Sequence, residues 1–274
     1  MKPSASASNR ARPLLGTFFT VPAEPDADHA FAEAERLEKI FSRFQESSCV
    51  SAFNRCAPGE VMPAGPEFRE LVALALAIWR ESKGAFNPFF PMRLPVECDP
   101  VQVHADGGVL KLAACRLDLN GIAKGYIADR VALEFKSLRR PARIDAGGDI
   151  CFLNPPAGNQ VQLRVGAPER PVMRTLMTQA RAVATSQAAA TALPGRSSQT
   201  RYAAQFRAPL TVQHTATVLA SSCAVADALT KVALFGEPAD IHRCCERFQA
   251  QVLLFDAEGE LVESYGPHEN IAAV

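Results

Sequence analysis

Stretches with helical periodicity and stretches of strand-like composition are interspersed along this chain, without a regular strand–helix–strand repeat. Residues 25–46 and 66–84 place apolar side chains three and four positions apart, which predicts two amphipathic helices. Pro66 and Gly84 stand where a helix commonly begins and ends. Because we find neither an internal repeat nor a linker, the pattern predicts a single α+β domain with mixed α/β layers, in which helices flank the sheets.

The rest of the chain continues this mixture. Residues 142–153 are strand-like but interrupted by Gly147 and Gly148, where a strand bulges or another group approaches the backbone. A hairpin turn is predicted around Glu258 and Gly259. The other predicted elements are a strand in 13–21, a hairpin of 107–112 with 115–119, a helix after Gly121, strands in 161–168, 176–186 and 214–220, helices in 222–236 and 238–248, and an unpatterned surface excursion at 189–211.

Composition narrows the class of function. The 274 residues are 48% hydrophobic, enough for a large buried core, and 29 basic residues balance 29 acidic ones. A net charge of zero offers no basic field for nucleic acid, so we expect a small molecule or a protein as partner. No apolar run is long enough to span a membrane, and the first 22 residues lack the apolar core of a secretory signal. The eight cysteines form no CxxC pair, which predicts reduced thiols in a soluble, cytoplasmic protein.

The segment "LDLNGIAKGYIAD" at 117–129 combines charges with a predicted strand-to-helix corner. Asp118 alternates with two leucines, and Gly121 permits a tight corner before the helix. The free amides of a helix N-terminus carry positive partial charge, and Lys124 adds a full charge on the first turn. This arrangement can grip a phosphate without a P-loop. Taken alone, the same pattern also fits a solvated helix start.

A second polar group lies in the apolar helix "ADALTK" at 226–231. Asp227 and Thr230 stand about 5 Å apart along the axis, at a rise of ~1.5 Å per residue. A carboxylate and a hydroxyl at this spacing can share a hard cation such as Mg²⁺, which also prefers phosphate oxygens and water. The alternative is an ordinary solvated helix face.

Five motifs in order resemble the ApbE family, the FAD:protein FMN transferases. They are "LLGT" at 14–17, "GAFNPF" at 84–89, the segment at 117–129, "DAGGD" at 145–149 and "ADALTK" at 226–231; "ESSCVSAFN", which ends at Asn54, and "VATS" at 183–186 add to the likeness. The resemblance implies an ApbE-like FAD-binding transferase domain over 13–274, after a flexible segment at 1–12. It also implies that FAD is split with Mg²⁺ and that FMN is attached to a threonine of an acceptor flavoprotein. Members of the family are often exported.

The resemblance assigns roles to particular residues. Contacts with FAD fall on Leu15, Phe44, Ala85, Phe86, Asn87, Asp118 and Lys124; metal ligands on the Gly121 carbonyl, Asp227 and Thr230; and the chemistry on Asp227 and Lys231.

The chain also departs from the family pattern. Leu15 stands in place of the usual methionine and Asn87 in place of the usual aspartate. Lys231 stands where the family usually has a threonine; a charged lysine cannot ligate a metal, but it can replace part of the cation's charge beside the pyrophosphate. The family's His-x-x-Asp-Pro segment has no counterpart in "TRYAAQFRAPL" at 200–210, and His214 is only a weak candidate substitute. Two alternative functions follow: a flavin-binding or assembly protein without transferase activity, and a Mg²⁺-dependent FAD pyrophosphatase.

Overall fold

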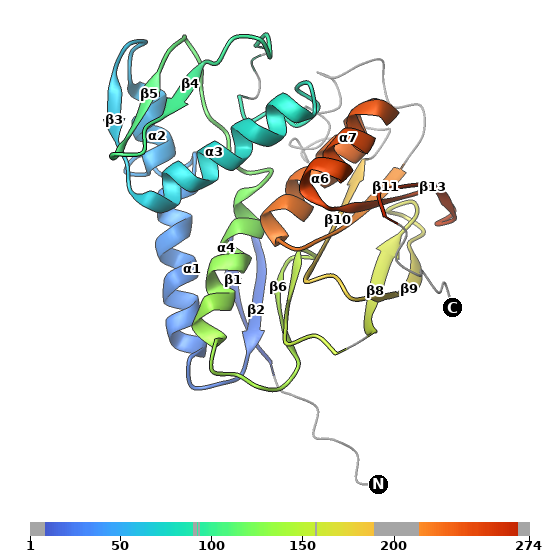
Figure 1. Cartoon of the computed structure of the whole chain (residues 1–274). Helices are drawn as coiled ribbons and strands as arrows, with labels where there is room; N and C mark the ends of the chain where they lie inside the picture. Colours follow the sequence, from blue (N-terminus) through green and yellow to red (C-terminus); the bar gives the residue numbers. More distant parts are fainter. Residues whose placement is uncertain (1–8, 90–91, 93, 157, 189–213, 268–274) are drawn as a thin grey trace, which may run out of the picture.

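An eight-stranded antiparallel sheet forms the centre of the computed structural model (Figure 1). The structure describes residues 9–89, 92, 94–156, 158–188 and 214–267. Across the sheet the strands are β1 (Asn9–Leu14), β2 (Thr17–Pro22), β6 (Ala142–Ala146), β7 (Ile150–Leu153), β10 (Ala182–Ala188), β11 (His214–Ala220), β12 (Gln251–Phe255) and β13 (Leu261–Tyr265).

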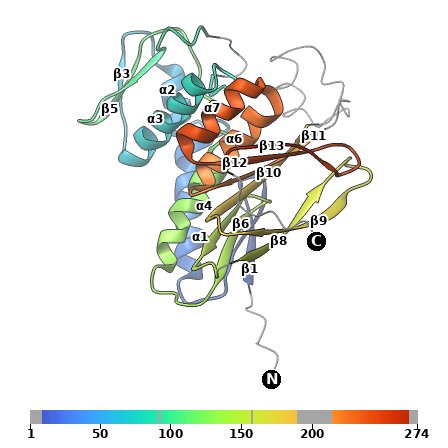
Figure 2. The same cartoon turned by 45° about the vertical axis from the view of Figure 1, so that its right-hand side comes forward.

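Helices cover one face of this sheet, and a two-stranded hairpin covers part of the other. Figures 1 and 2 show α1, α4 and α6 packed over the same face. On β7, Cys151 belongs to the core beneath the helices, whereas Ile150 and Phe152 belong to a second core with the hairpin. This alternation, which recurs on β10 to β12, explains the nearly continuous burial of the central strands. The helical elements are α1 (Ala27–Phe41), α2 (Cys49–Arg55), α3 (Pro66–Glu81), α4 (Ala123–Ala132), the 3₁₀ turn η1 (Leu133–Phe135), α6 (Cys223–Phe235) and α7 (Pro238–Phe248). The hairpin consists of β8 (Asn159–Val165) and β9 (Val172–Thr178).

The predicted α+β class with helices flanking sheets is confirmed. The helices expected at 66–84, after Gly121, at 222–236 and at 238–248 are present as α3, α4, α6 and α7. The helix expected at 25–46 is shorter, because α1 ends at Phe41 and the chain is extended at Ser42. The hairpin predicted around Glu258 and Gly259 joins β12 to β13.

The predicted hairpin of 107–112 with 115–119 is wrong. β5 (Gly108–Lys111) pairs instead with β3 (Val61–Pro63) and β4 (Val101–Val103) in a separate small sheet. Residues 115–119 are not in a strand, because an asparagine side chain takes the place of a strand partner. Asn54 donates to the Leu117 carbonyl at 3.0 Å and accepts from the Leu117 amide at 2.6 Å.

The single strand predicted in 13–21 is also wrong, because the segment folds back on itself as β1 and β2. Leu15 and Gly16 form the two-residue turn with φ angles of 57° and 72°, as a type I′ turn requires. β1 begins at Asn9, so residues 9–12, which we assigned to the N-terminal segment, pair with β2. The surface excursion predicted at 189–211 lies outside the described residues.

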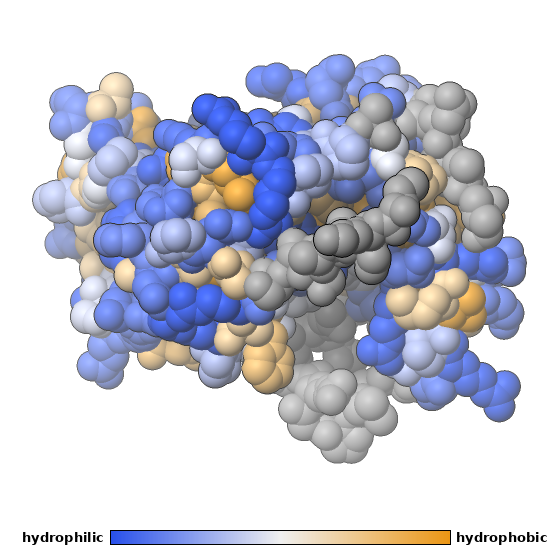
Figure 3. Space-filling view, turned by 90° about the horizontal axis from the view of Figure 1, so that it is seen from below, coloured by the Kyte–Doolittle hydropathy of each residue, from blue (hydrophilic) through white to orange (hydrophobic). Residues whose placement is uncertain are grey.

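The surface features agree with the composition. In the view from below, hydrophobic residues form small separate groups on a largely hydrophilic face (Figure 3). Among the described residues, no helix is long and apolar enough to cross a membrane. None of the eight cysteines, all of which the structure describes, forms a disulfide, and five of them are buried.

Candidate functional site

Helices α4 and α6 cross closely in antiparallel directions, and each caps the N-terminus of the other. Asp129 of α4 accepts hydrogen bonds from the amides of Cys223 and Ala224 at 2.8 and 2.9 Å. Asp227 of α6 accepts from the amide of Gly125 at 3.3 Å, in the first turn of α4. Carboxylates are stabilised at such positions by unpaired amides and by the helix dipole. This crossing brings together two motifs about a hundred residues apart in the sequence.

Four charged side chains meet beside this crossing: Lys124, Asp149, Asp227 and Lys231, hereafter the lysine–aspartate cluster. Lys124 forms an ion pair with Asp149, and its Nζ lies 3.5 Å from Asp227 Oδ2. Lys231 forms an ion pair with Asp227 Oδ1, and its Nζ donates to the Asp227 carbonyl at 2.8 Å. Asp227 is 0% exposed and Asp149 2% exposed, so two buried carboxylates are balanced by two ammonium groups.

The pKa values in the lysine–aspartate cluster differ because the carboxylates have different partners. Burial raises the pKa of Asp149 to about 6, with a further contribution from the charge of Asp227. Burial also favours the protonated form of Asp227, but the two lysines outweigh it and hold the Asp227 pKa below its usual value. For Lys124, burial lowers the pKa, and the two aspartates together raise it above the ordinary value. Lys124 and Asp227 are therefore charged at neutral pH, and Asp149 titrates just below it.

A second group of predicted residues lies around Arg43, which the sequence analysis missed. Arg43 Nη1 lies 3.4 Å from Asp118 Oδ2, and its guanidinium carbon lies 4.6 Å from the ring centre of Phe44. Phe44 is 76% exposed, so its ring is available to a ligand. Burial raises the pKa of Asp118, while the Asn120 amide and Arg43 act in the opposite direction. Arg43 thus connects two residues that we expected to contact FAD.

The "GAFN" segment packs against two glycines that flank helices, Gly121 before α4 and Gly236 after α6. A Cβ atom on Gly121 would lie 3.3 Å from Phe86 Cε2, and one on Gly236 would lie 3.2 Å from Ala85 Cβ. Asn87 is buried and accepts from the Phe89 amide at 2.9 Å, while its amide group donates to the Met92 carbonyl at 2.8 Å. These bonds hold the Asn87 side chain between the Phe89 amide and the Met92 carbonyl.

The first and fourth motifs also meet, where β2 begins and β6 ends. A Cβ atom on Gly147 would lie 2.8 Å from Thr17 Cβ, so the β6–β7 turn approaches the start of β2 closely. Leu15, in the preceding turn, is partly buried, and its amide donates to Glu38 Oε1 of α1 at 3.1 Å. Leu15 is thus hydrogen-bonded to α1. No described hydrogen bond connects it to the lysine–aspartate cluster.

The donor atoms expected to hold Mg²⁺ do not fit a bound divalent cation. Asp227 already accepts from the Lys231 ammonium group and the Gly125 amide, and its Oδ2 lies 3.5 Å from Lys124 Nζ. Thr230 is 0% exposed, and its hydroxyl is 2.8 Å from Ser186 Oγ and 2.7 Å from the Asp227 carbonyl. A Cβ atom on Gly121 would lie 3.7 Å from Lys231 Cε, so the lysine stem fills the space between Gly121 and Asp227. Within the described residues, no three His, Cys, Asp or Glu side chains converge on one point.

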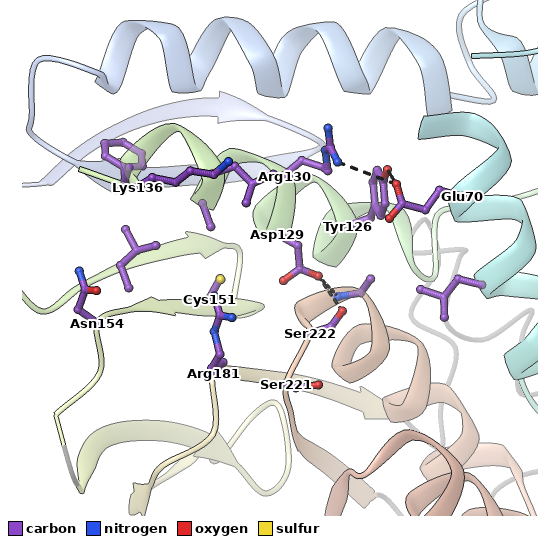
Figure 4. A pocket seen from close by; sticks show the side chains of 16 residues that line it. Glu70, Tyr126, Asp129, Arg130, Lys136, Cys151, Asn154, Arg181, Ser221 and Ser222 are labelled. Atoms are coloured by element: carbon purple, nitrogen blue, oxygen red, sulfur yellow. Dashed lines mark hydrogen bonds and ion pairs between the residues drawn. The ribbon is translucent and has the colours of Figure 1, made fainter. Parts of the chain in front are cut away.

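A pocket of about 450 Å³ lies along the C-terminal half of α4 (Figure 4). Asp129, Arg130 and Arg181 line it, together with Glu70 and Ser222. None of the predicted site residues contributes to its wall, and its Asp129 caps α6. Tyr126, also in the pocket wall, donates to Glu70 at 2.7 Å. We therefore place the candidate site at the lysine–aspartate cluster and not in this pocket.

Two contributors to the site, Arg43 and Asp149, were assigned no individual role from the sequence. Asp149 belongs to "DAGGD", which was recognised as a motif, but its partner Lys124 is 25 positions away. Arg43 lies beyond the end of α1 and had no distinguishing pattern. His214, the first residue of the strand predicted at 214–220, is also the first residue of β11. Residues 200–210 lie outside the described residues.

The family of the protein follows from its sequence: the sequence model of the ApbE family matches residues 15–92 and 92–254. This chain belongs to the ApbE family. A curated relative, the FAD:protein FMN transferase of Treponema pallidum (strain Nichols), is 27% identical over 157 residues; the match covers 46% of this chain and 43% of the relative. The chain thus matches less than half the length of that relative.

Solved structures of ApbE proteins share the fold. The apo form of the flavinyl transferase ApbE from Pseudomonas stutzeri has a TM-score of 0.71 at 22% identity, with 94% of each chain covered. The ApbE protein of Thermotoga maritima has a TM-score of 0.71 at 19% identity and covers 93% of this chain and 96% of its own. The flavin transferase ApbE of Vibrio cholerae has a TM-score of 0.68 at 19% identity, with 94% and 96% covered.

Proposed function

We propose that this chain binds FAD and transfers its FMN half to a threonine hydroxyl of an acceptor flavoprotein. The observation that carries the proposal is the lysine–aspartate cluster at the N-terminus of α4, within a chain of the ApbE family. The two ammonium groups suit the two negative charges of a pyrophosphate. Arg43, Phe44 and Asp118 are proposed to contact the rest of the FAD molecule.

The proposed transfer is a substitution at phosphorus and involves no change of oxidation state. The acceptor threonine oxygen forms a bond to the phosphorus of FMN, and the bond from that phosphorus to the bridging oxygen breaks. AMP leaves with the bridging oxygen, and the threonine proton passes to the surroundings. Lys124 and Lys231 would stabilise the charge that develops on the phosphate oxygens. Asp227 is proposed to position both lysines, because it contacts each of them.

We expect the transfer to be slow, because residues 200–210 lack the family's His-x-x-Asp-Pro segment. Loss of a group that positions or accepts the threonine proton commonly lowers a rate by about 10²–10⁴-fold. Binding depends on many separate contacts and should persist. Incubation with FAD, with and without Mg²⁺, and with a threonine-bearing acceptor tests this by mass spectrometry and nucleotide chromatography.

The four possible outcomes separate the candidate functions. FMN on the acceptor, with one AMP released for each, supports transfer. Free FMN with AMP supports the pyrophosphatase, in which water replaces threonine. FAD that binds but stays intact supports the flavin-binding or assembly role, and the absence of FAD binding would refute all three. A cytoplasmic location and the absence of nucleic-acid binding stay predictions from the sequence.

FAD affinity should increase as the pH falls from 7 to about 5.5. Since the pKa of Asp149 is about 6 in the fold, acidification adds a proton there and removes a negative charge beside Lys124. The diester pyrophosphate of FAD keeps its charge over this range, so less repulsion opposes it. At an effective dielectric constant near 20, a carboxylate about 7 Å from a phosphate repels it by roughly 2 kcal/mol, so proton uptake sets the limit. A group with a pKa of about 6 can change Kd by at most roughly eightfold between pH 7 and 5.5. Fluorescence titration at a series of pH values measures it.

Asp149→Asn is the matched control for this pH dependence. The amide keeps the shape of the side chain and can still accept a hydrogen bond from Lys124. FAD binding by this variant should be as tight at pH 7 as that of the wild type at pH 5.5, and its Kd should change little with pH. A variant that retains the wild-type slope would assign the titration to another group.

A further inference from the structure

The side chain of Lys231 lies where the family resemblance places a metal ion, between Gly121 and Asp227. Its Cε lies 3.7 Å from the position of a Cβ on Gly121. Its Nζ contacts both the carboxylate and the carbonyl of Asp227, the latter at 2.8 Å. The lysine side chain is 16% exposed, so it is largely enclosed at this position. One cationic group therefore already occupies the space that the expected ligands surround.

Thr230 cannot replace the missing threonine ligand in this arrangement. It stands three residues after Asp227 and not four, so it projects about 100° away from the face that carries Lys231. Its hydroxyl contacts Ser186 on β10, at 2.8 Å, and the carbonyl of its own helix. The position that faces Gly121 is thus filled by an ammonium group, which has no lone pair for a metal.

We propose that the ammonium group of Lys231 replaces the divalent cation, so that this chain binds flavin nucleotide phosphates without Mg²⁺. The identity of the ligand rests on the proposed function; the exclusion of Mg²⁺ by Lys231 does not. An ammonium group carries one positive charge where Mg²⁺ carries two. The site therefore retains electrostatic attraction for phosphate but provides weaker stabilisation of the AMP leaving group, in line with slow transfer.

Lys231→Thr tests the proposal by placing a hydroxyl four residues after Asp227. Calorimetry with Mg²⁺ alone should detect no binding to the wild type and should detect binding to Lys231→Thr. Millimolar Mg²⁺ should likewise raise the Tm of the variant and leave that of the wild type unchanged. These two measurements need no flavin. Mg²⁺ binding by the wild type, or none by a folded Lys231→Thr, would overturn the exclusion of the metal by Lys231.

FAD titrations in EDTA and in Mg²⁺ then test the consequence for the ligand. The wild-type Kd should be the same in both. Lys231→Thr should bind FAD about tenfold or more weakly in EDTA, the loss of one charged hydrogen bond, and Mg²⁺ should restore its affinity. Equal wild-type and Lys231→Thr affinities in EDTA, or a wild-type affinity that needs Mg²⁺, would contradict a phosphate-binding role for Lys231. If neither protein binds FAD in either buffer, the proposed function and this role both fail, while the Mg²⁺ measurements still decide the exclusion.

Lys231→Met is the control that separates loss of charge from gain of a ligand. Methionine fills similar space, but it offers no charge and no oxygen for Mg²⁺. This variant should bind FAD as weakly as Lys231→Thr in EDTA, and Mg²⁺ should not restore its affinity. If Mg²⁺ restores the FAD affinity of Lys231→Met as well, then the threonine hydroxyl of Lys231→Thr is not the group that binds the metal. Circular dichroism of each variant establishes that it is folded before its binding is compared.

Discussion

Replacing Asp227 with alanine should lower the free energy of unfolding by about 3 kcal/mol and abolish FAD binding. Asp227 is 0% exposed, and it contacts Lys124, Lys231 and the Gly125 amide. Removing one partner of a buried ion pair commonly costs 3–5 kcal/mol, because the remaining charge is left without compensation. We expect the lower end, because the lysine side chains are 30% and 16% exposed and can reach water.

The effect should appear in both thermal and urea unfolding. A loss of about 3 kcal/mol corresponds to a Tm lower by roughly 6–12 °C in a chain of this size. Asp227→Asn should lie between the wild type and Asp227→Ala, because its amide oxygen can still accept from Gly125 while its charge is gone. Asp28→Ala is a surface control, since Asp28 also bridges two arginines but has a 65% exposed side chain. That control should leave the Tm nearly unchanged; an equally stable Asp227→Ala would contradict the structural role of Asp227.

The helices were predictable because their signals are local. In α6, Ser222 accepts from the Val225 amide and Gly236 follows the last helical residue, so both ends are marked in the sequence. The same is true of Pro66 at the start of α3. Capping and punctuation act within one turn, and no tertiary contact is needed to recognise them.

The error at 115–119 has a tertiary cause. Leu117 and Leu119 are buried and Asp118 is less so, which imitates the alternation of a strand. The backbone there bonds instead to the Asn54 side chain and, through the Asp118 amide, to the Pro88 carbonyl at 2.8 Å. Alternating burial specifies which side chains point inward, but it does not specify the hydrogen-bonding partner.

The candidate site was predictable only in part, for the same reason. Lys124 and Asp227 were recognisable because each stands in a distinctive local motif. That Asp227 reaches the first turn of α4, and that Asp149 reaches Lys124, depends on helix packing and on the β6–β7 hairpin. The expected metal ligands were inferred from spacing and resemblance, whereas the position of the Lys231 side chain required the structure.

Gly125→Ala should be among the most destabilising single changes in this chain, with a loss of about 3 kcal/mol or more. A methyl group at Gly125 would lie 2.5 Å from the Cys223 carbonyl carbon and 2.8 Å from the Ala224 amide nitrogen. Both atoms belong to the backbone of α6, so no side-chain rotation can relieve the overlap. The two helices must move apart, although alanine in a helix is otherwise favoured over glycine by about 1 kcal/mol.

The separation of α4 from α6 would also disrupt the site, because the Gly125 amide bonds to Asp227 and the adjacent Lys124 belongs to the lysine–aspartate cluster. We therefore expect Gly125→Ala to lose FAD affinity even at temperatures where it remains folded. Urea denaturation measures the stability, and FAD titration well below the Tm measures the binding.

Gly65→Ala is the matched control: Gly65 precedes α3 with φ −65°, and a Cβ there would meet only Glu67 Oε2, at 3.5 Å. The control should change stability by less than about 1 kcal/mol and leave FAD binding intact. If Gly125→Ala behaves like this control, then α4 and α6 are not held at the distance that places Asp227 against the first turn of α4.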